Sequence, residues 1–250
     1  MNYQDINAKT IDSWVEGGWE WGTPVSREEC DRARAGEWSV LLTPTRPVPV
    51  DWFGDLRGKK LLGLASGGGQ QMPIFAIAGA DCTVFDYSEK QLEQDRMVSE
   101  RENYPIRIVR GDMSKPLPFG DGEFDVIFHP VSNVYIREVL PLWRECFRIL
   151  KPGGRLLAGL DNGLCYALDD AEERIVRGLP FDPMADEKLL EESLASDSGV
   201  QFSHTMDEQI RGQIQAGFRI LDLYEDTNGF GRLEELKIPT FWATLAQKPM

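Results

Sequence analysis

The feature that most constrains the fold is a glycine-rich turn placed between a predicted strand and a predicted helix. Lys60–Leu64 is a short apolar segment, Ala65–Gly69 contains three consecutive glycines, and a helix is predicted from about Gln70. Glycine lets a backbone turn tightly and come close to a bound molecule. The sequence therefore predicts a ligand site where this first strand ends.

Strand and helix patterns alternate after this turn. Tyr135–Leu150 has a helical composition in which Pro141 must kink or restart the helix, and Lys151–Gly154 is predicted to be a tight turn. Further helices are predicted at Ser88–Asn103 and, with Ile210 and Ile214 on the buried face, from Thr205 to Gly217. The other predicted strands are Cys82–Asp86, Ile106–Val109, Phe124–Phe128, Arg155–Leu160, Phe218–Tyr224 and Thr240–Ala246. This alternation predicts an α/β fold with a mostly parallel seven-stranded sheet and helices on both faces, because parallel strands need crossover connections.

Two segments lie outside this alternation. Residues 1–57 are rich in tryptophan and end in a proline-containing connector, so we expect an N-terminal cap followed by a domain that spans residues 58–250. Within that domain, residues 162–200 are predicted to form a helical insertion. The tryptophans Trp14, Trp19 and Trp21 either pack the cap against the domain or form a lid over the ligand site.

The composition argues against several classes of protein. The net charge is −14, which argues against a nucleic-acid substrate because phosphate binding requires clusters of Lys and Arg. The four cysteines are scattered and form no metal-binding pair, so we expect no metal site and a reducing cytoplasm. The N-terminus lacks the features of a signal peptide, and no apolar stretch reaches the roughly 20 residues of a membrane span.

Polar side chains follow several of the predicted strands. Asp86, Asp112 and His129 each lie at or just after a strand end, the edge at which parallel sheets bind ligands. Asp86 is placed to accept hydrogen bonds from two ribose hydroxyls. Asp161 and Asn162 follow the fifth strand and either line a pocket or form an exposed turn. The glycine-rich turn and Asp86 alone do not distinguish a nicotinamide-dependent oxidoreductase from a methyltransferase.

The order of the remaining motifs is more specific. Asp112-Met113 is followed by Leu117-Pro118-Phe119, then by the apolar strand from Phe124 and by Arg148–Leu156, which contains Lys-Pro-Gly-Gly. With this series of blocks the sequence resembles the class I S-adenosylmethionine-dependent methyltransferases, most closely those that act on small molecules. The resemblance covers about residues 59–160 and implies a Rossmann-like fold with a reversed last strand. It also implies S-adenosylmethionine as the cofactor and a small-molecule methyl acceptor.

The resemblance implies roles for individual residues. Asp86 is expected to hold the ribose, and His129 is expected next to the transferable methyl group. His129 and Asn133 are the candidate catalytic residues, which either position the acceptor or, for His129, accept a proton; the alternative is that His129 makes only structural hydrogen bonds. The other expected cofactor contacts are the methionine part at Ala65, Ser66, Gly67, Gly69 and Gln70, and the adenine at Tyr87, Asp112 and Met113.

Two positions depart from the family pattern. Gly63 stands where the family usually has an acidic residue, and Ala65 replaces the first loop glycine. Alanine is tolerated there if its φ is negative. These departures leave open a second hypothesis, a non-catalytic module that keeps the fold and binds the cofactor. The sequence alone identifies neither the acceptor nor the oligomeric state.

Overall fold

The computed structural model describes residues 2–250 and contains one seven-stranded sheet in the order β3-β2-β1-β4-β5-β7-β6. Strands β1 to β5 pair in parallel, whereas β7 lies antiparallel between β5 and β6. The strands are β1 Lys60–Leu64, β2 Asp81–Asp86, β3 Arg107–Arg110, β4 Phe124–His129, β5 Leu150–Asp161, β6 Arg219–Asp226 and β7 Phe241–Gln247. The predicted α/β class, the number of strands and the reversed last strand are confirmed.

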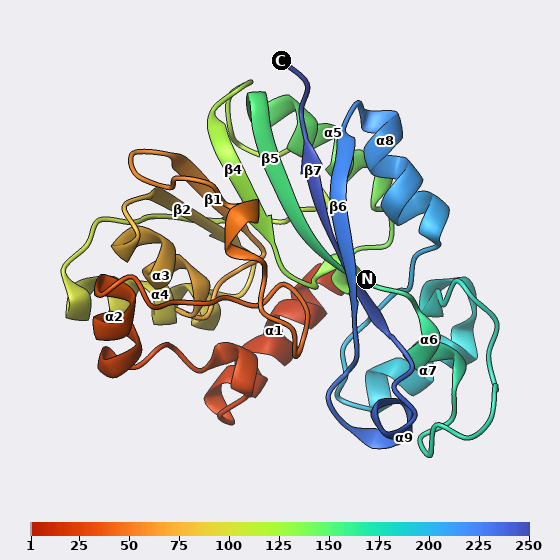
Figure 1. The fold of residues 1–250 in the computed structure, drawn as a ribbon. Helices are drawn as coiled ribbons and strands as arrows, with labels where there is room; N and C mark the ends of the chain where they lie inside the picture. The colour runs from red at the N-terminus through yellow and green to blue at the C-terminus, as the bar shows by residue number, and fades with distance from the viewer. Residues whose placement is uncertain (1) are drawn as a thin grey trace.

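The helices cover both faces of the sheet (Figure 1). Their bounds are α1 Tyr3–Glu16, α2 Arg27–Arg34, α3 Gln71–Ile77, α4 Glu89–Glu102, α5 Leu140–Ile149, α6 Leu164–Ala167, α7 Glu187–Ala195, α8 Gly212–Ala216 and α9 Gly231–Glu235. Successive side chains of a strand point to opposite faces. Leu61 of β1 accordingly packs with Phe75 of α3 in one core, and Leu62 packs with Trp143 of α5 in the other.

The predicted restart of a helix at Pro141 is confirmed: helix α5 begins at Leu140, later than the predicted Tyr135, and Pro141 lies in its first turn, where a missing N–H breaks no helical bond. Two other local predictions are corrected by the structure. The expected tight turn at Lys151–Gly154 belongs instead to β5, with a bulge opposite Phe124 and a positive φ of 78° at Gly153. Ile214 is 54% exposed, because a π-helical segment at Asp207–Arg211 changes the face that the following turn buries.

The two segments outside the strand–helix alternation contain helices of their own. The first 57 residues hold α1, α2 and two 3-10 turns, η1 at Glu20–Gly22 and η2 at Val50–Trp52. The segment 162–200 is helical only at α6, α7 and the 3-10 turn Pro183–Ala185, and the rest of it is loop. The segment thus combines short helices with loop, and its description as an insertion in the domain stays a prediction. Within the described residues, no helix is long and apolar enough to cross a membrane.

Candidate active site

The glycine-rich turn lies at the carboxyl end of β1 and packs tightly against α4. Gly68 and Gly69 have φ values of 106° and 66°, a region that suits glycine. A Cβ at Gly67 would lie 2.6 Å from Gln91 Cβ, so the close packing also requires glycine there. Ala65 has a φ of 47°, which is positive and not the negative value that would make alanine free of strain.

The space that a side chain at Gly63 would occupy is taken by the side chain of Met72. A Cβ at Gly63 would lie 2.6 Å from both the Cε and the Sδ atoms of Met72. Met72 is fully buried in α3. A larger side chain at residue 63 therefore requires Met72 to move.

Asp86 ends β2 and faces the turn. Its Oδ2 accepts a hydrogen bond from the Gly67 N–H at 3.0 Å, and its Oδ1 accepts one from the Ser88 N–H at 3.0 Å. Burial raises the pKa of this carboxyl above its usual value, while the backbone N–H groups act in the opposite direction. A carboxylate has about four acceptor positions, so both oxygens keep the capacity to bind ribose hydroxyls.

The expected adenine residues line a small hollow next to Asp86. Asp112 and Met113 border it together with Tyr87. Asp112 Oδ1 accepts a hydrogen bond from the Ser114 N–H, and the Tyr87 hydroxyl donates to Asp5 of α1 at 2.6 Å. Helix α1 therefore closes the outer side of this hollow.

The hollow adjoins a cavity of about 400 Å³, large enough for a small ligand. Ala65, Asp86 and Tyr135 border both. The cavity wall includes the predicted residues Ala65, Ser66, Gly67, Gln70 and Asp86. It extends past the ends of β4 and β5 to an apolar region that includes Val131 and Phe241.

Gln70 holds a protein segment rather than pointing freely into the cavity. Its Nε2 donates to the Glu20 carbonyl at 2.6 Å and to the Thr23 carbonyl at 2.9 Å. The next residue, Gln71, was not singled out by the sequence analysis. It borders the cavity and accepts a hydrogen bond from the Ser66 hydroxyl at 3.2 Å. The only sequence signal for it is its place at the start of the helix after the turn.

Part of the N-terminal segment forms a wall of the cavity. Trp19 and Trp21 border it, while Trp14 lies outside and packs on Trp19 with ring centroids 5.1 Å apart. At the start of α1, the Asn7 side chain donates to the Val200 carbonyl and accepts from the Val200 N–H. The N-terminal segment is thus tied to the segment that precedes residue 200.

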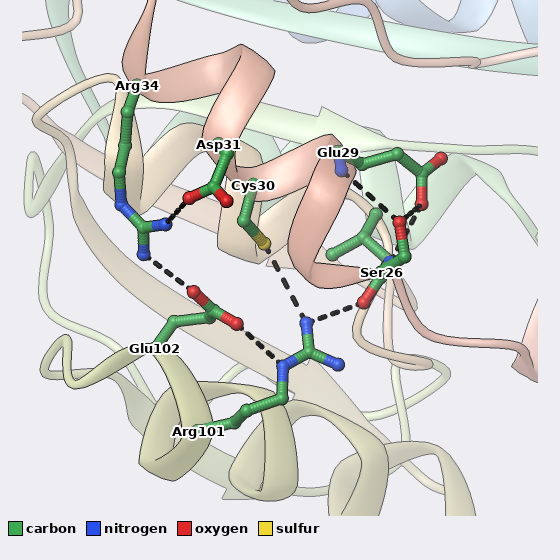
Figure 2. Close-up of polar contacts among 8 residues, drawn as sticks. Ser26, Glu29, Cys30, Asp31, Arg34, Arg101 and Glu102 are labelled. Carbon is green, nitrogen blue, oxygen red and sulfur yellow. Dashed lines mark hydrogen bonds and ion pairs between the residues drawn. The ribbon is translucent and has the colours of Figure 1, made fainter.

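A second attachment fastens α2 to the end of α4 (Figure 2). Arg34 forms an ion pair with Glu102 at 2.6 Å, and Arg101 forms one with the same carboxylate at 2.7 Å. Arg101 also donates to the Val25 carbonyl at 2.6 Å. These contacts anchor the chain after the short segment that carries Trp19 and Trp21, and the bonds between Asn7 and Val200 anchor it before that segment.

The two candidate catalytic residues are buried behind the cavity wall. His129 Nε2 lies 2.7 Å from Asn133 Oδ1, and His129 Nδ1 lies 2.9 Å from the Leu64 carbonyl. Burial lowers the pKa of His129, with the hydrogen bonds to Asn133 and Leu64 acting in the opposite direction. Asn133 donates in turn to Gln209 at 3.0 Å. Neither residue borders the cavity, and this geometry supports the structural alternative for His129.

The fold and the site together define an α/β protein with a ligand-sized cavity at the carboxyl ends of its parallel strands. A family model described as "Methyltransferase domain" matches residues 62–158. A Bacillus subtilis protein named "Uncharacterized methyltransferase YbaJ" is 41% identical over 249 residues, which cover 97% of each chain. The chain belongs to the S-adenosylmethionine-dependent methyltransferases.

More distant relatives agree with this assignment. A demethylmenaquinone methyltransferase of Renibacterium salmoninarum is 31% identical over 45% of each chain. The solved structure of an S-adenosylmethionine-dependent methyltransferase from Mesorhizobium loti superposes with a TM-score of 0.62, at 22% identity, over 79% of this chain and 94% of that one. The family excludes the nicotinamide-dependent alternative and disfavours the non-catalytic one.

Proposed function

We propose that this enzyme transfers the methyl group of S-adenosylmethionine to a small molecule in the cytoplasm. The observation that carries the proposal is the shared wall of Ala65, Asp86 and Tyr135, which joins the nucleoside hollow to a larger, partly apolar cavity. Such a cavity is typical of small-molecule sites. The demethylmenaquinone enzyme matches less than half of this chain, so its acceptor is not carried over.

The residues present fit the cofactor in separate parts. Asp86 would hold the ribose, Asp112 and Met113 the adenine, and the turn Ala65–Gly69 with Gln71 the methionine part. When bound, S-adenosylmethionine supplies a methyl group that is already activated by a sulfonium. The protein's contribution is to orient the acceptor and to exclude water, for which Trp19 and Trp21 are placed at the cavity wall.

The test is calorimetric titration of the protein with S-adenosylmethionine, S-adenosylhomocysteine and NAD. We expect both adenosyl ligands to bind and NAD not to bind. Asp86→Asn keeps the shape of the side chain but removes its charge, which we expect to cost about 1.5–3 kcal/mol of binding free energy. Asp81→Asn, at the exposed start of the same strand, is the matched control. Failure of the wild-type protein to bind either adenosyl ligand would refute the proposal.

A further inference from the structure

We propose that Asp161 binds the methyl acceptor and that this acceptor is an amine with an apolar body and no acidic group. The inference rests on the proposed function and specifies its acceptor. It assigns a role to a residue that has no expected contact with the cofactor, at the end of β5, three strands along the sheet from the strand that ends at Asp86.

Asp161 is a buried carboxylate with one unused oxygen. Asp161 borders the cavity, and the residue is only 5% exposed. Oδ1 accepts a hydrogen bond from the Gly163 N–H at 2.7 Å, whereas Oδ2 has no hydrogen-bond partner among the described residues. An unsatisfied buried acceptor costs about 1–3 kcal/mol, and more when it is charged. A donor on a bound molecule would remove that cost.

The backbone of Asp161 is held firmly by a buried polar network. Gln209 Nε2 donates to the Asp161 carbonyl at 2.6 Å, and Gln209 Oε1 accepts from Asn133, which contacts His129. Gln209 lies in the π-helical segment, a local structure that is frequent at functional sites. The network fixes the position of the Asp161 backbone, and it makes no hydrogen bond to the buried Oδ2 atom.

The charge of the cavity wall selects against an anionic acceptor. The wall contains two carboxylates, Asp86 and Asp161, and no Lys, Arg or His side chain among the described residues. An acceptor with a carboxylate or phosphate would find no cationic side chain in the wall, which is unfavourable. An ammonium group would find a counter-charge at Asp161.

The surroundings of Asp161 favour an apolar body on the acceptor. Tyr166 and Phe241 border the same end of the cavity. The Tyr166 ring stacks on Phe181 with centroids 5.3 Å apart, and its hydroxyl donates to Gln201 at 2.6 Å. The aromatic ring is thereby fixed in place beside Asp161, and its hydroxyl proton is already used.

The same carboxylate can take up the proton that an amine must lose. Burial raises the pKa of Asp161 to about 7, with the Gly163 N–H acting in the opposite direction. An ammonium proton would move to the Asp161 carboxylate, which leaves a neutral amine with a free electron pair. The amine nitrogen then forms a bond to the methyl carbon as the carbon–sulfur bond breaks, with that electron pair going to sulfur. The products are a methylated ammonium, a thioether and a protonated Asp161 that returns its proton to solvent.

The test uses benzylamine, benzyl alcohol and benzoate, which share an aromatic ring and differ in charge and in donor groups. Their binding is measured by ligand-observed NMR with and without S-adenosylhomocysteine. The proteins are the wild type, Asp161→Asn and the control Asp170→Asn, which changes an exposed aspartate nearby. We expect the wild type and Asp170→Asn to prefer benzylamine, and Asp161→Asn to bind it about tenfold more weakly or worse, because it loses the charged partner.

Equal binding of benzylamine and benzoate by the wild type, or unchanged benzylamine binding by Asp161→Asn, would overturn the proposal. Equal binding of benzyl alcohol and benzylamine by the wild type would also overturn it. A second measurement follows the titration of the Asp161 carboxyl of the wild type by carbon NMR. Benzylamine should lower the apparent pKa of this carboxyl, and an unchanged titration would contradict the proposal. Loss of S-adenosylhomocysteine binding would affect only the proposed function, since the probes are also tested without it.

Discussion

The Ala65 N–H donates a hydrogen bond to the Phe85 carbonyl across 2.7 Å while the Ala65 backbone has a φ of 47°. This bond joins the turn after β1 to the end of β2, one residue before Asp86. The left-handed backbone of Ala65 thus accompanies a contact between the ends of β1 and β2, and an L-residue other than glycine adopts it at a cost.

Ala65→Gly should stabilise the protein. Removing the Cβ relieves the left-handed strain, although glycine also adds disorder to the unfolded chain, and we expect a net gain of about 0.4–1 kcal/mol in the free energy of unfolding. Urea unfolding measures it. Ala76→Gly within helix α3 is the control and should lose about 0.5–1 kcal/mol. A loss of stability at both positions would mean that Ala65 is not strained.

Gly63 and Met72 should behave as a coupled pair. Gly63→Ala places a Cβ 2.6 Å from the Met72 thioether and should cost about 1–3 kcal/mol of stability through overpacking. Met72→Ala creates space and should cost about 2–5 kcal/mol. In the double variant the new methyl group enters that space, so the total should be smaller than the sum. Strict additivity in denaturant unfolding would contradict this packing.

Gln70→Ala should loosen the segment that carries Trp19 and Trp21. The change removes the two hydrogen bonds to the Glu20 and Thr23 carbonyls. We expect faster hydrogen–deuterium exchange in residues 18–24 and weaker S-adenosylhomocysteine binding, with a cost in global stability of about 1–2 kcal/mol at most. Gln94→Ala on the neighbouring helix α4 should change neither. Unchanged exchange in Gln70→Ala would show that this segment is held by other contacts.

Asp161 should make the stability of the protein depend on pH. Burial raises the pKa of Asp161 from its ordinary value of 3.8 to about 7 in the folded state. Between these two pH values, the folded protein therefore binds one proton more than the unfolded protein. Stability conferred by the protonated form is therefore lost as the pH rises from about 4 to about 7, by roughly 4 kcal/mol at most. The neighbouring ionisable groups, Cys165 and Tyr166, have raised pKa values and stay neutral in that window.

Asp161→Asn removes this titration. In urea unfolding at several pH values, the free energy of unfolding of the wild type should fall relative to that of the variant as the pH rises towards 7. Asp81→Asn should follow the wild-type curve. Parallel curves for wild type and Asp161→Asn would place the Asp161 carboxyl in water rather than in a dry site.

The sheet, and the position of the glycine-rich turn beside Asp86, were predictable because their signals are local. The turn Ala65–Gly69 is followed along the chain by Asp86, and both lie at strand ends that a parallel sheet brings to one edge. The partners of Gln70 and the packing of Met72 against Gly63 depend on side chains that only the folded chain brings together. The unused oxygen of Asp161 likewise depends on Gly163 occupying the other one.

His129 shows why a residue type at a strand end does not establish its role. The sequence places it beside the cofactor, but its orientation is decided by Asn133 and by Gln209, which lies in a distant π-helical turn. A helical pattern gives no sign of the extra residue in such a turn. The same turn explains why Ile214 is exposed and Gln209 is buried.

The paired hydrogen bonds between Asn7 and Val200 link the first helix to the part of the chain that follows α7. Segments far apart in the sequence are therefore joined beside the small hollow, which Asn7 borders. A chimera in which the N-terminal segment alone is replaced is expected to lose both hydrogen bonds unless it keeps an asparagine at position 7.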